Sequence, residues 1–277
     1  MLNSFEWNGI SFRDFETPAV RLMVKKSPVI PRPAKRYDKY SVRGRNGDIF
    51  IPQGAYDNYV QPYELFLYTT KKGDDLNELA QAISDWLYEP AGYAKLVDDH
   101  EGDYFRLAYF AGPFNVDNLL TVFGNAKVEF NCRPERFLET GDIERAVTNN
   151  LLTNGWYTLN NPTNQIAKPL IEVELNEPED ASSVYAGVKI QIEHGTGILS
   201  WTYMRQDQAT YLIVDSDTMN WKTSVQYAGK NVTGPLEMPL LKPGESKIRV
   251  VGLNSNGTEV ASNQYPKWTI KPRWWVL

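Results

Sequence analysis

Short segments of strand-like composition recur through the second half of the chain, and this recurrence limits the possible folds more than any other feature. The segments lie at residues 170–175, 188–192, 198–203, 211–215, 224–227, 247–251 and 268–274. Gly, Asn, Pro and Asp separate them, and no helical periodicity interrupts the series. Short strands at this spacing over about 110 residues are typical of an antiparallel β-sandwich, which we expect here.

The first half of the chain contains one segment with clear helical periodicity, residues 75–88. Asp75 followed by Glu78 fits a capping box at its start. Apolar residues recur behind the cap at helical spacing, namely Leu76, Leu79, Ala80, Ile83 and Leu87. We expect this face to pack on a sheet whose strands include residues 63–68, 104–110 and 119–131.

A polar, turn-rich run at residues 139–169 divides the two halves. Such composition favours a domain boundary, and a chain of 277 residues is long enough for two domains. The sequence therefore predicts a mainly β protein. An N-terminal β-sheet domain with one helix covers residues 1–140, and the antiparallel sandwich covers residues 141–277.

The strongest local turn pattern is Asn46-Gly47. A two-residue Asn-Gly loop favours a type I′ turn, because both central residues must take positive φ. We therefore expect a hairpin that enters through residues 40–45 and returns through residues 49–51. Pro52 has no backbone N–H for a ladder, so the returning strand should end there or lie at a sheet edge.

Charge and composition argue against several classes of protein. A net charge of −5 with a pI near 5.3 disfavours nucleic-acid binding, which needs a basic surface. No run of apolar residues is long enough for a membrane span, and the N-terminus lacks the pattern of a signal peptide. Because Cys132 is the only cysteine, no intrachain disulfide can form. We expect synthesis in a cytoplasm.

Catalytic and metal-binding patterns are weak. His100 and His194 fall in different predicted domains, which disfavours a multi-histidine zinc site. The acidic run at residues 98–103 lacks the spacing of an EF-hand, and Cys132 is expected as a small core residue. No nucleophile elbow, Walker loop or dinucleotide fingerprint is present. We expect no cofactor and no enzyme activity, although sequence alone leaves a carboxylate dyad open.

Aromatic residues in the second half allow two interpretations. Trp201 and Tyr203 lie on one face of a predicted strand, and Trp221 follows. Exposed rings would give stacking platforms for a sugar. Core packing is the favoured interpretation for most of them, and these three residues remain the candidate sugar-stacking set.

Several phrases of the sequence resemble the distal tail proteins of siphophages, the Dit family. The principal phrase is SVRGRNGDIFIPQGAYDNYV at residues 41–60, which is similar to the N-terminal domain of that family. Others follow in the same order: GNAKVEFNCRPERFL, NPTNQIAKPLIEVE, YLIVDSDTMNW, LKPGESKIRVVG and KPRWWVL. The resemblance covers nearly the whole chain, through ordered phrases rather than one diagnostic motif.

This resemblance implies a structural virion protein of a phage or prophage, a baseplate component at the tip of a long non-contractile tail. Such proteins form a hexameric ring through the N-terminal domain. They join the tail tube protein to tail-associated and receptor-binding proteins, and their second domain is a galectin-like sandwich. The resemblance does not carry over a sugar site.

Self-assembly is therefore the function we expect, with the exposed hairpin at the seam between subunits. The candidate interface residues are Arg43, Arg45, Asn46, Gly47 and Asp48; solvated turn charges are an equal alternative. A carbohydrate-binding module that recognises host cell-wall polysaccharide is the second interpretation. A tail-associated hydrolase is the third, and it would need a close carboxylate pair lining a cleft.

Overall fold

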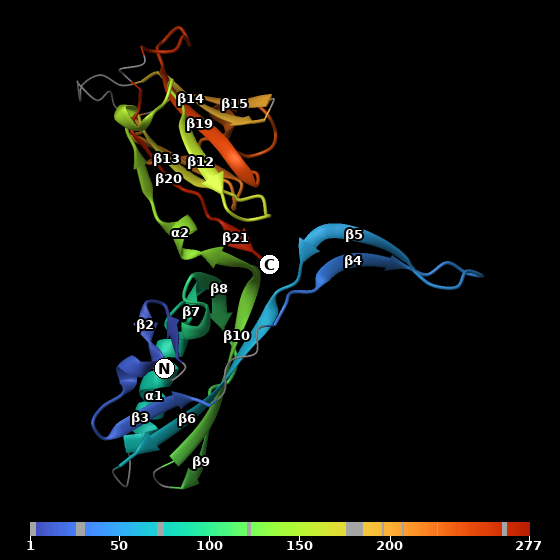
Figure 1. Cartoon of the computed structure of the whole chain (residues 1–277), viewed down its shortest axis with the longest axis vertical. Helices are drawn as coiled ribbons and strands as arrows, with labels where there is room; N and C mark the ends of the chain where they lie inside the picture. Colours follow the sequence, from blue (N-terminus) through green and yellow to red (C-terminus); the bar gives the residue numbers. More distant parts are fainter. Residues whose placement is uncertain are drawn as a thin grey trace. The chain divides into compact units, whose positions relative to one another are not determined.

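The computed structural model describes residues 4–25, 31–70, 75–120, 123–175, 185–195, 197–206, 208–225, 227–261 and 265–277. The chain divides into two compact units, Met1–Arg136 with Leu277 and Phe137–Val276. This division falls a few residues before the boundary expected from the sequence. The fold is mainly β, as predicted (Figure 1).

The first unit contains a large sheet with strand order β2-β1-β7-β8-β10-β6-β3, and β9 also pairs with β10. The strands are β1 (Phe5–Trp7), β2 (Ile10–Ser11), β3 (Val20–Val24), β6 (Tyr59–Thr69), β7 (Ala94–Asp98), β8 (Tyr104–Phe110), β9 (Val116–Leu120) and β10 (Phe123–Leu138). The longest ladder joins β6 and β10 antiparallel, from Phe123 opposite Tyr68 to Cys132 opposite Tyr59. β10 extends well beyond the strand expected at residues 119–131.

Period-two alternation explains how this sheet acquires an inner and an outer face. Along β6 every second residue from Tyr59 to Thr69 is buried. Helix α1 (Asp75–Tyr88) packs its buried residues into the same hydrophobic core, which also contains Phe5, Trp7 and Phe130. The helix residues in this core are Leu76, Leu79, Ile83, Trp86 and Leu87. The expected helix is confirmed, and Trp86 is an addition to its predicted apolar face.

The second unit is a β-sandwich of two five-stranded sheets, with orders β11-β20-β13-β16-β17 and β12-β19-β14-β15-β18. The first sheet contains β11 (Arg145–Val147), β13 (Leu170–Glu174), β16 (Tyr211–Asp215), β17 (Asn220–Thr223) and β20 (Trp268–Lys271). The second contains β12 (Tyr157–Asn161), β14 (Gly187–His194), β15 (Gly197–Met204), β18 (Val232–Thr233) and β19 (Gly244–Leu253). One hydrophobic core includes buried residues of both sheets, such as Ile171 and Ile190.

Two predicted strands of the sandwich need correction. The strand expected at residues 224–227 lies earlier, because β17 ends at Thr223 and Ser224 and Val225 bend away from it. The strand expected at residues 268–274 stops at Lys271, before Pro272, which lacks a ladder N–H. A separate short strand, β21 (Trp275–Val276), follows that break.

Candidate subunit-contact site

The hairpin expected around Asn46 and Gly47 is present and forms a sheet of its own. β4 (Lys35–Tyr40) pairs antiparallel with β5 (Ile49–Tyr56), and no other described strand joins them (Figure 1). We call residues 35–56 the arm. Both of its strands are sheet edges and leave one row of backbone N–H and C=O groups unpaired with strands.

The connection between the strands differs from the expected two-residue turn. Tyr40 pairs with Ile49, so residues 41–48 form the loop. Gly47 has φ of 80°, but Asn46 is not in the positive-φ region, and a type I′ turn requires both. Gly44, with φ of 83°, belongs to an earlier turn in which the Arg45 N–H donates to the Val42 carbonyl over 3.1 Å. The turn at Val42–Arg45 replaces the expected two-residue Asn46-Gly47 turn and makes the connection between the strands longer.

Pro52 lies inside β5, opposite Tyr37, and does not end the strand. A two-stranded sheet has only edge strands, so the missing N–H can face solvent. The expectation of an edge position is therefore confirmed. The register shifts between Lys35 and Tyr37, and Gly54 on the opposite strand has φ of 68°, which fits a bulge at this point.

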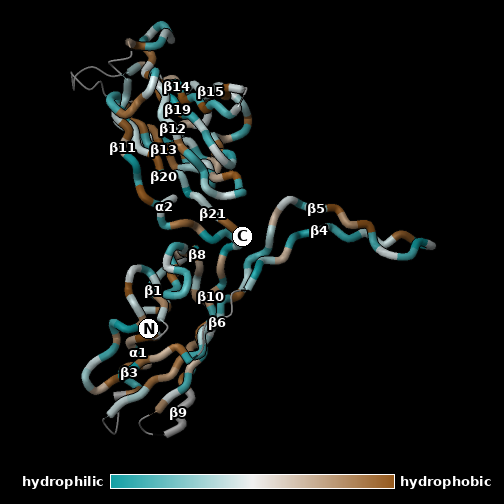
Figure 2. Tube along the Cα trace, in the orientation of Figure 1, coloured by the Kyte–Doolittle hydropathy of each residue, from teal (hydrophilic) through white to brown (hydrophobic). Residues whose placement is uncertain are grey.

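The arm exposes apolar side chains on both faces. Exposed fractions are 44% for Tyr37, 54% for Tyr40, 54% for Phe50 and 49% for Ile51. Figure 2 shows hydrophobic stretches of β5 alongside the hydrophilic β4. The Tyr37 and Phe50 rings meet edge to face at 6.0 Å, but an isolated two-stranded hairpin has no core to bury them. Exposed apolar side chains without a core indicate a binding surface.

The arm loop gathers all five candidate interface residues, and each of them is exposed: Arg43, Arg45, Asn46, Gly47 and Asp48. Within the described part of the chain, Arg43, Arg45 and Asp48 form no ion pair or side-chain hydrogen bond. Their charges are therefore available to another molecule or to solvent. Sequence reasoning missed the exposed rings of β4 and β5, although the alternation of Tyr with charged residues in KRYDKY could have identified β4.

The candidate sugar-stacking residues are corrected by their burial. Trp201, Tyr203 and Trp221 are 2%, 1% and 6% exposed, within the sandwich core. The Trp201 Nε1 donates to the Glu237 carbonyl at 2.8 Å, and the Trp221 Nε1 lies 3.1 Å from the Met238 sulfur. Because their faces are covered, none of the three rings can stack on a sugar. The expectation of core packing for most of these aromatics is confirmed.

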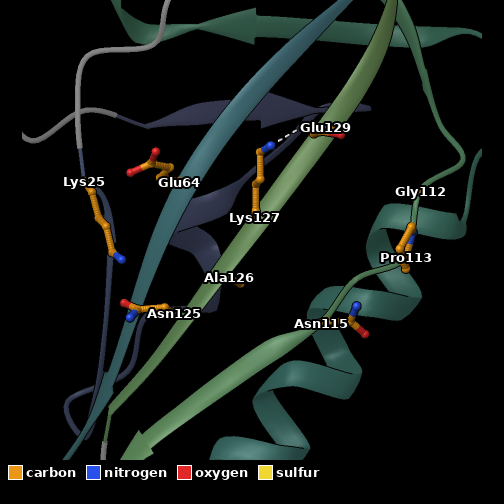
Figure 3. Close-up of a pocket in the computed structure, with 9 residues that line it drawn as sticks. All are labelled: Lys25, Glu64, Gly112, Pro113, Asn115, Asn125, Ala126, Lys127 and Glu129. Carbon is orange, nitrogen blue, oxygen red and sulfur yellow. Dashed lines mark ion pairs between the residues drawn. The ribbon is translucent and has the colours of Figure 1, made fainter.

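A shallow pocket of about 480 Å³ lies on the first unit (Figure 3). Lys25, Glu64, Asn125, Lys127 and Glu129 contribute polar side chains to it. Lys127 lies opposite Glu64 in the ladder, and its Nζ is 2.5 Å from Glu129 Oε1. Lys127 therefore lies between the carboxylates of Glu64 and Glu129, an arrangement typical of ion pairs on an exposed sheet face.

Two side chains that could act as nucleophiles, Cys132 and Ser246, are not accessible. Cys132 is fully buried, and burial raises the pKa of its thiol to about 12. Ser246 Oγ is 3.0 Å from His194 Nδ1, and His194 Nε2 is 2.8 Å from the Leu240 carbonyl, which resembles a nucleophile–base pair. However, Ser246 is only 1% exposed, so no substrate can reach it. The pair ties β14 and β19 to the segment that contains Leu240.

Among the described residues, no group of three or more His, Cys, Asp and Glu side chains could hold a metal ion. No described helix has the length and apolar composition required to cross a membrane.

The architecture is mainly β, with two compact units and an exposed two-stranded arm in the first unit. No protein-family model and no curated protein matches the sequence. Among solved structures, the chain is similar to the crystal structure of SPP1 Dit (gp 19.1), described as a paradigm of the hub adsorption apparatus in phages that infect Gram-positive bacteria. The TM-score is 0.59, with 11% sequence identity over 98% of both chains. The chain therefore has the Dit fold, as the sequence phrases predicted.

Proposed function

We propose that this chain is a structural component of a siphophage tail tip that assembles into a ring and acts without catalysis. The observation that carries the proposal is the similarity to SPP1 Dit over 98% of both chains. The ring would be hexameric, at the end of the tail tube. It would join the tube protein to the tail-associated and receptor-binding proteins of the virion.

The arm supplies the physical means of assembly. A hairpin with two open edges can add its unpaired backbone groups to a neighbouring chain. Its exposed rings gain burial on contact, which stabilises an association by roughly 25 cal/mol per Å² of apolar area before the costs of ordering. Because the arm meets a different surface on its neighbour, the contact is head-to-tail, and it closes into a ring when six copies complete one full rotation.

A double substitution in the arm loop tests this proposal. Arg45→Glu reverses a free charge, and Gly47→Val places a β-branched residue at φ of 80°, which strains the loop. We expect light scattering to show loss of the ring while circular dichroism shows an unchanged fold. Lys222→Glu, at an exposed position of β17 in the second unit, is the matched control and should leave the ring intact. An unchanged hexamer in the double variant would contradict this role for the arm.

Negative-stain microscopy of purified protein or virions tests the function itself. Six-fold rings with a central channel at the tail tip are the expected result. Virions that lack the chain, shown by mass spectrometry of purified particles, would overturn the proposal. The carbohydrate-binding alternative requires exposed aromatic rings that stack on a sugar. The three candidate residues, Trp201, Tyr203 and Trp221, are buried and cannot supply them.

A further inference from the structure

The arm is basic although the chain as a whole is acidic. It contains Lys35, Arg36, Lys39, Arg43 and Arg45 against Asp38 and Asp48, a formal charge of +3 in a chain of net charge −5. Three of these cations are engaged nearby, and Lys35 Nζ lies 6.0 Å from the centre of the Tyr56 ring. Arg36 Nε lies 2.6 Å from Asp57 Oδ1, and Lys39 Nζ lies 5.5 Å from the centre of the Phe50 ring. The free positive charge is therefore concentrated on Arg43 and Arg45 in the exposed loop.

Helix α1 presents the opposite charge. Its outward stripe consists of Glu78, Gln81, Ala82 and Asp85, and the exposed Glu89 follows directly after the helix; we call these five residues the acidic face. These positions recur at helical spacing, opposite the buried residues of the helix. No Lys or Arg occurs in residues 75–88, so nothing on the helix neutralises the carboxylates. The Gln81 amide donates to Asp85 Oδ1 at 2.6 Å and holds that carboxylate on the surface.

Several other acidic residues of the first unit already have partners. Glu101 pairs with Arg106 and, at 2.5 Å, with Arg136. Asp98 is buried and accepts from Tyr63, and Asp99 lies 3.9 Å from Arg13. By contrast, Glu78 and Glu89 have no ion pair within the described part of the chain. The acidic face is thus an available counterpart for a basic ligand, with several carboxylates on one exposed surface.

We infer that the arm loop of one copy docks on the acidic face of α1 of a second copy. This inference rests on the proposed self-assembly and specifies the two surfaces that meet. The loop and the acidic face are both exposed in the single chain, so the charges of neither surface are covered by the other within one copy. Charge complementarity fixes the pairing and disfavours contact of one arm with another.

The dimensions of the two surfaces agree. Glu78 and Asp85 are two helical turns apart, roughly 10 Å along the axis. Arg43 and Arg45 are two residues apart, at most roughly 7 Å between Cα atoms, and their long side chains cover the difference. Ala82 lies between the two carboxylates and leaves room for the loop backbone. Val42 on the loop and Tyr88 beside the acidic face, 44% and 50% exposed, add apolar contact.

A charge exchange tests the pairing. Arg43→Glu with Arg45→Glu should weaken self-association at least about tenfold, and Glu78→Lys with Asp85→Lys should do the same. Combining all four substitutions in one chain recreates complementary charges with the signs exchanged and should restore association. Sedimentation velocity measures the assembly, and circular dichroism checks that each variant is folded. Lys222→Glu with Lys267→Glu, both exposed in the second unit, controls for the change in net charge.

Three outcomes would overturn the inference. In the first outcome, each double variant loses assembly and the variant with all four substitutions also stays dissociated. That result would mean that the arm binds a different surface. Both pairs could leave association unchanged. The unmodified chain could remain monomeric at every concentration tested, which would mean that the arm does not bind a second copy directly.

A disulfide experiment separates this inference from the proposed function. Arg45→Cys combined with Ala82→Cys should give a ladder of covalent oligomers on oxidation, whereas either substitution alone should not. The native Cys132 is buried and does not interfere. Six-fold rings that form without the ladder would overturn the arm–helix contact and leave the proposed function intact. Absence of rings and of the chain from virions would instead overturn the proposed function.

Discussion

Arg273 shows how one residue can hold a strained backbone position. Its φ is 56°, a region that non-glycine residues rarely adopt. Its N–H donates to the Gly141 carbonyl at 2.7 Å, and its guanidinium lies 2.5 Å from Asp215 Oδ1. Burial alone would raise the pKa of Asp215, but the hydrogen bond and charge of Arg273 outweigh it and lower that pKa. The ion pair therefore offsets the backbone strain.

Removing this ion pair should produce a pH-dependent loss of stability. Because the folded-state pKa of Asp215 is depressed, its contribution is present above the unfolded pKa of about 3.9 and is lost as pH falls through the folded value. Arg273→Gly should cost about 1–2 kcal/mol at pH 7, net of the strain that glycine relieves. Urea unfolding between pH 7 and pH 3 would measure the difference from the native chain.

That difference should shrink as the pH falls below about 4. Arg273→Ala is the matched variant and should be less stable than Arg273→Gly, since alanine keeps the backbone strain. A constant difference across the pH range would contradict a role for Asp215 ionisation.

Residue-level prediction from sequence succeeded where one pattern dominates. Cys132 was expected in the core from alternation with polar neighbours, and it is fully buried. The positive φ of Arg273 and its pairing with Asp215 were not predictable, because the two residues are far apart in sequence. Trp201 shows the same limit: its face of the strand was predictable, but the segment that covers it was not.

At the scale of elements, the two strands of the arm form ladder hydrogen bonds only with each other among the described strands. A two-stranded hairpin is marginal in isolation. The Asn46-Gly47 pattern predicted the hairpin but not its length, because the turn at Val42 and Arg45 ends the pairing earlier. Helix α1 was predicted well, since its apolar residues recur over several turns. The helix's acidic face could also have been read from the sequence, but its proposed partner could not.

The arm loop should be the first site of proteolysis in the free chain. Arg43 and Arg45 are exposed in a loop, where trypsin can bind extended backbone. Limited digestion followed by mass spectrometry should find the first cut after one of them. Arg43→Gln with Arg45→Gln should remove that cut, and assembled rings should be protected. A first cut elsewhere with the arm intact would mean that the loop is more ordered than its exposure indicates.

At the scale of the molecule, the described core residues form two separate clusters, one for each compact unit. The sequence predicted this mainly β, two-part organisation from segment spacing and from the polar run at residues 139–169. It also predicted the Dit fold from ordered phrases, although identity to SPP1 Dit is only 11%. The proposed contacts between copies could not be predicted, because they require the surfaces of two folded copies.

Two cores should give two unfolding transitions. Leu65→Ala, in the core of the first unit, should lower the stability of that unit by about 2–5 kcal/mol. Leu212→Ala in the sandwich core should do the same for the second unit only. Differential scanning calorimetry of both variants would separate the transitions. One shared transition that moves equally in both variants would show that the units unfold together.

The basic arm on an acidic chain also has a kinetic consequence. Opposite charges attract over about one Debye length, roughly 8 Å at physiological salt. A diffusing copy would therefore be oriented arm-first before the apolar side chains meet. Salt would slow the encounter, while Tyr40, Phe50 and Ile51 would set how long the complex lasts. Speed and lifetime of assembly would thus depend on different residues of the same hairpin.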